Sequence, residues 1–139
     1  MELSHRIKIF LYRQQGPEPS YLLLKPDQGI EALWGPLHGE LGFGDKLEGA
    51  VRRKVMSDTG IAKPGQLIDL EMPGRFTLGD EEIIEWTYGY QSLADLDRER
   101  MTQHWADFRW LEFTDAYPSL GFEADRGALM RLHAKLRVA

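Results

Sequence analysis

The feature that most constrains the fold is a glycine-rich segment that leads directly into an amphipathic helix. Residues 37–44 contain three glycines and predict an extended loop. Asp45 and Glu48 then have the spacing of a capping box, with Asp in place of the usual Ser or Thr. Four apolar residues follow at helical spacing: Leu47, Ala50, Val51 and Val55. Because Gly60 is typical of a helix C-terminus, we expect a helix that begins at the loop and ends there.

Strands are predicted before this helix. Residues Ile7 to Tyr12 are nearly all apolar or aromatic, and Tyr21 to Leu24 form a second short apolar run. Between them, Gln14–Ser20 contains a glycine and two prolines, which indicates the loop of a hairpin. We interpret Asp27–Gly35 as a connector to the glycine-rich segment.

After the helix, three more runs predict strands: Leu67–Met72, Glu82–Tyr90 and Phe108–Leu111. The first two would pair as a hairpin across residues 78–80, and the charged residues 92–101 predict a loop or short helix. Apolar spacing over Glu123–Leu136 predicts an amphipathic terminal helix. Since two helices are too few for a doubly wound parallel sheet, we predict an α/β (α+β) fold with mixed strands packed between two helices.

Composition narrows the class of protein. With 139 residues, the chain 1–139 has the length of one domain, typically about 100–150 residues. Its net charge of −5 argues against a nucleic acid polymer or an anionic membrane as the partner. The absence of cysteine excludes disulfides, thiolate catalysis and Cys-ligated zinc. No run approaches the roughly 20 apolar residues of a membrane span, and no secretory segment is evident, so we expect a cytoplasmic location.

Residues 39–61 resemble the Nudix box, the sequence motif of the Nudix hydrolases. Five residues fall on motif positions: Gly39, Arg53, Val55, Gly60 and Ile61. Asp45 and Asp58 stand where the motif has Glu and keep an acid, whereas Lys54 and Ser57 stand at Glu positions and lose it. The box is therefore degenerate.

The flanking segments resemble the same family. Residues 34–39 (Trp-Gly-Pro-Leu-His-Gly) look like its lead-in to the box. Residues 104–111 resemble a strand of the subgroups that cleave dinucleoside polyphosphates or pterin triphosphates. The resemblance implies a Nudix-like α/β/α sandwich with a mixed β-sheet, and a hydrolase that cleaves the pyrophosphate bond of a nucleoside diphosphate linked to another group.

By this resemblance, Mg²⁺ or Mn²⁺ would be held by box carboxylates and by the backbone carbonyl of His38, while Arg53 would orient a carboxylate. Here the metal-binding helix face carries Lys54, Ser57 and Asp58, and Gln103 replaces a further Glu of the subgroups. Two unit charges about 4 Å apart interact by roughly 4 kcal/mol at an effective dielectric of about 20. A divalent ion beside the Lys54 ammonium would be repelled by about twice that energy. The carboxylate set is therefore depleted and the metal site impaired or altered.

Each candidate residue has two interpretations. The Lys54 ammonium either takes the place of the metal and binds a phosphate, or pairs with Asp58 on a solvated helix face. Asp58 is then either a residual metal ligand or that partner. Arg53 either fixes the loop or a phosphate, or forms a surface ion pair. Trp34 either stacks a nucleotide base, close to Gly39 of the box, or belongs to the core.

An acidic cluster lies in the second half of the chain at Glu81, Glu82 and Glu85. It could replace the missing carboxylates, but a solvated sheet edge is the commoner explanation of such a cluster. Specificity would lie in the variable loops, which we place at Gln14–Ser20, Pro73–Asp80 and Ser92–Gln103.

Two functions follow. The first is the Nudix-type hydrolase with an altered metal site, which would depend on Mg²⁺ or Mn²⁺. The second is a catalytically silent Nudix-fold module that binds a nucleotide or related ligand, with a binding or regulatory role. Both predict a small nucleotide-like partner, and the resemblance adds an expectation of pairing into a homodimer.

Overall fold

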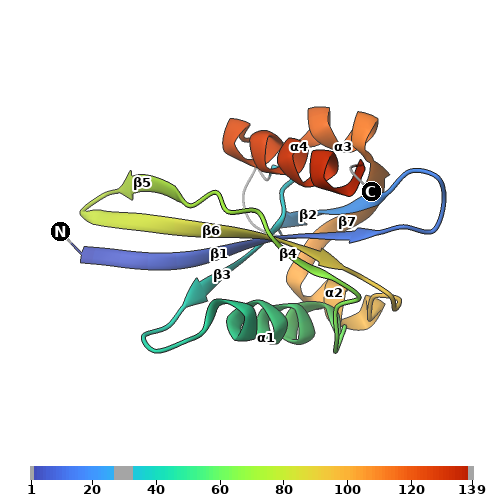
Figure 1. The fold of residues 1–139 in the computed structure, drawn as a ribbon. Helices are drawn as coiled ribbons and strands as arrows, with labels where there is room; N and C mark the ends of the chain where they lie inside the picture. The colour runs from blue at the N-terminus through green and yellow to red at the C-terminus, as the bar shows by residue number, and fades with distance from the viewer. Residues whose placement is uncertain (1, 27–32, 138–139) are drawn as a thin grey trace.

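A seven-stranded mixed sheet lies between two layers of helices (Figure 1). The computed structural model describes residues 2–26 and 33–137. The strands are β1 (Glu2–Arg13), β2 (Ser20–Pro26), β3 (Leu37–Leu41), β4 (Leu67–Asp69), β5 (Gly74–Leu78), β6 (Glu81–Gln91) and β7 (Trp105–Glu112). The helices are α1 (Leu47–Thr59), α2 (Arg98–His104), α3 (Phe113–Ser119) and α4 (Glu123–Arg137). This arrangement confirms the predicted α/β/α sandwich.

The sheet has the order β4-β6-β1-β2-β7, with β3 also paired to β1 and β5 to β6. Only β1 and β6 run parallel, and every other pair among the described residues is antiparallel. Strands β1 and β2 pair only at Tyr12–Tyr21 and Arg13–Ser20. Residues 5–9 of β1 pair instead with β3, while β2 pairs with β7 along its whole length. The sheet therefore divides between β1 and β2, and residues 34–36 lead into β3 at this division.

Alternating residues of the central strand β1 face the two helical layers. Ile7, Ile9 and Leu11 pack toward α1, and Phe10 and Tyr12 pack toward α3 and α4. All five side chains are almost completely buried, because helices cover both faces of this strand. Lys8, on the same strand, lies on the α4 face and is also buried. A buried charge needs a partner of opposite charge.

The box helix differs from the prediction at its start. It begins at Leu47 with Lys46 as N-cap, and no side chain caps it. The capping-box prediction is wrong because the Asp45 carboxylate instead accepts from the Gly42 amide, 2.8 Å away. The end is as predicted: Gly60 has φ +83°, and its amide donates to the Met56 carbonyl at 3.0 Å.

Other segments correct the sequence interpretation. Residues 37–41, predicted as loop, form β3 through backbone pairing with β1. The turn at residues 78–80 joins β6 to β5, which lies within the predicted loop Pro73–Asp80, whereas β4 pairs with β6 separately. Four helices are described rather than two: α2 lies where a loop or short helix was predicted for residues 92–101, and α3 was not predicted. Most of the predicted connector Asp27–Gly35 lies outside the described residues.

Among residues 2–26 and 33–137, none of the helices is both long enough and apolar enough to cross a membrane.

Candidate functional site

The candidate box site is the surface formed by Gly39, Arg53, Lys54 and Asp58, where β3 meets α1. Gly39 lies on the face of β3 that α1 covers. A Cβ atom at this position would sit 3.1 Å from Lys54 Cγ and 3.3 Å from Ile7 Cγ1. The glycine therefore lets the Lys54 stem lie directly on the strand backbone, which explains the need for glycine here in terms of close approach.

Lys54 is held by Asp58 one helical turn away. Its Nζ atom lies 3.0 Å from Asp58 Oδ2. The lysine side chain is 34% exposed and the aspartate only 8%, so the ammonium reaches solvent whereas the carboxylate does not. The i,i+4 pair of the second interpretation of Lys54 is present, but the helix face is not fully solvated because Asp58 is buried. The carboxylate available to a metal is thereby already neutralised.

Arg53 points away from this pair, toward the loop before the helix. Its Nη2 atom lies 3.1 Å from Asp45 Oδ1, and the guanidinium side chain is 64% exposed. The other oxygen of Asp45 accepts from the Gly42 amide, so Arg53 and Gly42 together fix the carboxylate. The contact is an exposed ion pair between the helix and the loop, and a functional role for Arg53, in the loop or toward a phosphate, stays a prediction.

The donor set of the box site does not fit Mg²⁺ or Mn²⁺. These ions favour several oxygen ligands at once. Within the described part of the chain, no three His, Asp or Glu side chains gather in a way that could hold a metal. Asp58 is paired, and Ser57 and Lys54 supply no carboxylate. The resemblance implied a cation here, but these residues would not bind it in the usual way.

Glu85, one of the three acids of the acidic cluster, does not lie at a solvated sheet edge. This carboxylate is 12% exposed, and its Oε1 atom lies 3.2 Å from the Nζ atom of Lys8. Lys8 also donates to Asp125 Oδ1 of α4, 3.0 Å away. The expectation fails because β6 pairs in parallel with the central strand β1, which places Glu85 inside the sheet rather than at its edge. We call Lys8, Glu85 and Asp125 the buried triad.

His38 connects the box strand to the buried triad. Its backbone pairs with Lys8 of β1, and its Nε2 atom lies 3.7 Å from Glu85 Oε2. Partial burial lowers the pKa of His38, which opposes the rise that the nearby Glu85 charge would cause. Because it contacts Glu85, the His38 imidazole lies on the α4 face, whereas its neighbour Gly39 lies on the α1 face. The signal for the triad was a lysine within an otherwise apolar run, at residues 7–12.

Trp34 lies at the division of the sheet between two cationic side chains. The Lys25 Nζ atom is 5.8 Å and the Arg109 Cζ atom 5.4 Å from the centroid of its ring. The tryptophan is half-buried and packs against the α4-side core, as the core interpretation expects, and base stacking stays a prediction. An aromatic face flanked by cations suits a phosphorylated ring compound.

The fold is similar to those of many solved structures. A C. elegans Ap4A hydrolase in a binary complex matches with a TM-score of 0.73 and 18% identity, over 96% of this chain and 98% of that chain. The E. coli dihydroneopterin triphosphate pyrophosphohydrolase matches with a TM-score of 0.77 and 17% identity, over 94% and 95%. The Nudix domain of Shewanella oneidensis NrtR, crystallised with ADP ribose, matches with a TM-score of 0.70 and 17% identity, over 100% and 90%.

No protein-family model matches the chain, and no curated protein matches it. The structural likeness therefore extends over nearly the whole chain, while the sequence has diverged. At these identities the likeness shows the fold.

Proposed function

Since the chain has the Nudix fold, we propose that it binds a nucleotide-like ligand without cleaving it in a metal-dependent reaction. The observation that carries this proposal is the pairing of Asp58 with Lys54 at 3.0 Å. Asp58 is the one acid among the three metal-facing helix positions, Lys54, Ser57 and Asp58. With that acid neutralised, the helix face presents a cation instead of a metal-binding carboxylate set.

The positive charge that remains suits a phosphate. The Lys54 ammonium is about one-third exposed, so a phosphate oxygen could reach it without displacing Asp58. At the division of the sheet, Trp34 offers a ring face for stacking. Lys25 adds a cation beside it, and the nearby Arg109 guanidinium is already paired with Asp107. The S. oneidensis Nudix domain that binds ADP ribose supports a ligand with two phosphates and a base.

The second candidate function is pyrophosphate hydrolysis with Mg²⁺ or Mn²⁺. It is favoured by Gly39, Arg53 and Asp58, which keep their box positions, and by neighbours named as hydrolases. In this case Asp58 would give up its pairing with Lys54. Asp58 and the backbone carbonyl of His38 would then hold the metal. The ammonium would then have to turn into solvent, because it would repel the divalent ion.

In both cases we propose a small nucleotide-like partner rather than a nucleic acid polymer, in keeping with the acidic net charge. A cytoplasmic location and pairing into a homodimer remain expectations from the sequence.

The decisive experiment measures binding and cleavage on the same protein. ADP ribose and a dinucleoside polyphosphate are offered at millimolar Mg²⁺ and then Mn²⁺, while the melting temperature and the nucleotide products are followed. We expect ADP ribose to raise the melting temperature without forming AMP, and Lys54→Ala to reduce that rise. AMP formation that falls sharply in Asp58→Asn would overturn the proposal in favour of hydrolysis.

A restored double variant, Lys54→Glu with Ser57→Glu, serves as the matched control. If it cleaves a substrate that the parent leaves intact, the scaffold is competent and the missing carboxylates account for the silence of the parent.

A further inference from the structure

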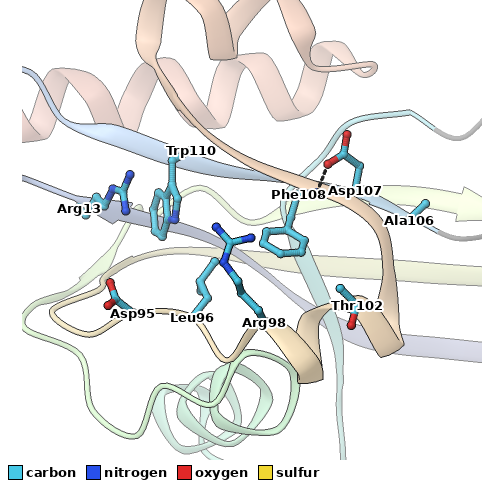
Figure 2. A pocket seen from close by; sticks show the side chains of 9 residues that line it. All are labelled: Arg13, Asp95, Leu96, Arg98, Thr102, Ala106, Asp107, Phe108 and Trp110. Carbon is cyan, nitrogen blue, oxygen red and sulfur yellow. Dashed lines mark hydrogen bonds between the residues drawn. The ribbon is translucent and has the colours of Figure 1, made fainter.

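A groove on the α1 side of β7 has no role in the proposed function. It encloses about 750 Å³ between β7 and residues 95–102, and is lined chiefly by Arg13, Leu96, Arg98, Thr102, Phe108 and Trp110. Figure 2 shows Arg13 and Trp110 at one end, with Leu96 and Arg98 approaching Phe108 from the opposite wall. None of these residues belongs to the box site or to the buried triad.

Two arginines of the groove are free to bind an anion. The Arg13 Cζ atom lies 4.4 Å from the centroid of the Trp110 ring, and the Arg98 Cζ atom lies 5.8 Å from that of Phe108. Within the described residues, neither guanidinium forms an ion pair with a carboxylate. A guanidinium over a ring keeps its N–H groups available at its edge, and their planar arrangement matches the oxygens of a phosphate.

The acids of the groove do not cancel this charge completely. Asp107 accepts from the Phe108 amide at 2.8 Å and from Arg109 Nη2 at 3.2 Å. Its charge is therefore already offset by an arginine outside the groove. Asp95 is the other lining acid, so the lining sets two arginines, Arg13 and Arg98, against this one remaining acid. The groove is thus locally cationic in a chain whose net charge is −5.

The floor of the groove provides flat aromatic surface. Phe108 and Trp110 are two residues apart on β7, so their side chains project from the same face of the strand. Both are half-buried: they pack against the α1-side core, while the groove reaches them from the other side. Aromatic faces beside cations favour a ring that itself carries an anionic group.

We propose that this groove is a second ligand site, which takes a phosphorylated planar ring compound of the nucleoside monophosphate class. The phosphate lies between the guanidiniums of Arg13 and Arg98, and the ring lies against the parts of Phe108 and Trp110 that the two guanidiniums leave uncovered. The site does not depend on the box, and its occupancy requires no bond to be broken.

The test is a titration of the full chain with AMP, adenosine and inorganic phosphate, followed by calorimetry and by backbone amide NMR. Amide shifts within residues 95–110 report the groove, and shifts within 38–60 report the box site, so the failure of either proposal is seen separately. We expect AMP to shift the groove amides and to bind at least tenfold more tightly than adenosine or phosphate.

The double variant Arg13→Gln with Arg98→Gln should weaken AMP binding at the groove at least tenfold. Arg131→Gln is the matched control, since Arg131 is an exposed arginine on α4 with no ion pair within the described chain, and it should bind as the parent does. Unchanged groove binding in the double variant, verified as folded by its amide spectrum, would overturn the proposal. So would equal affinity for phosphate and AMP, because the rings would then contribute nothing.

Discussion

The box site and the buried triad use the same chemistry in opposite surroundings. In the box site Lys54 pairs with Asp58 four residues along one helix, and the lysine side chain is 34% exposed. In the buried triad Lys8 contacts two carboxylates from β6 and α4, and its side chain is 4% exposed. The first pair is local and half in water, whereas the second joins three distant elements inside the molecule.

The difference shows which lysine contributes most to the stability of the fold. The exposed Lys54 ammonium can be solvated when its partner is removed, which keeps the cost of that loss small. A buried charge left without its partner must instead bear the full cost of desolvation. The triad therefore adds an ionic link between α4 and the sheet, while the partly exposed ammonium of the box site stays accessible to a ligand.

The largest effect is expected from Lys8→Met. This variant leaves Glu85 and Asp125 close together without a cation, and breaking such a buried pair typically costs about 3–5 kcal/mol. Urea unfolding of parent and variant at neutral pH measures the loss. A loss below about 1 kcal/mol would mean that water reaches the triad, and the contrast between the two regions would then disappear.

Because Lys8→Met could prevent folding, a compensated variant sharpens the same point. Lys8→Met combined with Glu85→Gln and Asp125→Asn removes all three charges, so no buried charge is left unpaired. We expect it to recover a large part of the stability lost in Lys8→Met alone, as seen in the urea midpoint. Failure to recover would show that shape rather than charge determines this region.

Asp58→Asn should have an intermediate effect. The Asp58 carboxylate is 8% exposed, but its partner reaches solvent and can be hydrated when the charge is lost. We expect a loss of about 1 kcal/mol, within the usual range for one hydrogen bond, again from urea unfolding. A loss as large as that of Lys8→Met would place the box site among the buried ionic sites.

This contrast also explains what the sequence could predict. The Lys54–Asp58 pair, the helix end at Gly60 and the strand Ile7–Tyr12 depend on neighbours within a few residues, so periodicity and spacing revealed them. In the triad, Glu85 lies 77 positions and Asp125 lies 117 positions after Lys8 in the sequence. The parallel pairing of β1 with β6 is what brings Glu85 to Lys8. No local pattern at Glu85 distinguishes a buried strand from a solvated edge.

Short elements failed for the same reason. Strand β3 was predicted as loop because residues 37–44 contain three glycines, and pairing with β1 overrides that local signal. Asp45 was assigned to the helix cap from spacing alone, but Arg53 and the Gly42 amide compete for its carboxylate. The aromatic groove likewise needs β7 and residues 95–102 to be placed in space before it can be recognised.

Acid should weaken the α4 face rather than the box face. His133 of α4 lies 2.7 Å from the Tyr21 hydroxyl, and burial is the main cause that lowers its pKa below the ordinary 6.5. As the pH falls below about 6.5, the unfolded chain binds this proton before the folded chain does, so stability is lost. Above that pH the residue contributes no pH dependence.

The measurement is the free energy of unfolding between pH 7.5 and pH 5 for the parent and for His133→Gln, which cannot titrate in this range. We expect a shallower loss in His133→Gln, while Lys54→Ala follows the slope of the parent. Parallel slopes for the parent and His133→Gln would contradict the assignment to this histidine.

The smallest effect on stability is expected from Lys54→Ala, and its smallness is what makes the variant informative. An i,i+4 ion pair on a helix contributes about 0.2–0.5 kcal/mol. We expect truncation of Lys54 to alanine, a good helix former, to let water reach the Asp58 carboxylate, so that this charge is not left buried without a partner. Urea unfolding should therefore scarcely distinguish variant from parent.

Under our proposal the same variant binds ADP ribose several-fold more weakly, since the ammonium that meets the phosphate is gone. A residue that affects affinity but not folding acts on the ligand directly. If instead stability falls by more than 1 kcal/mol while affinity is unchanged, Lys54 is a structural residue and the ligand site must lie elsewhere on the chain.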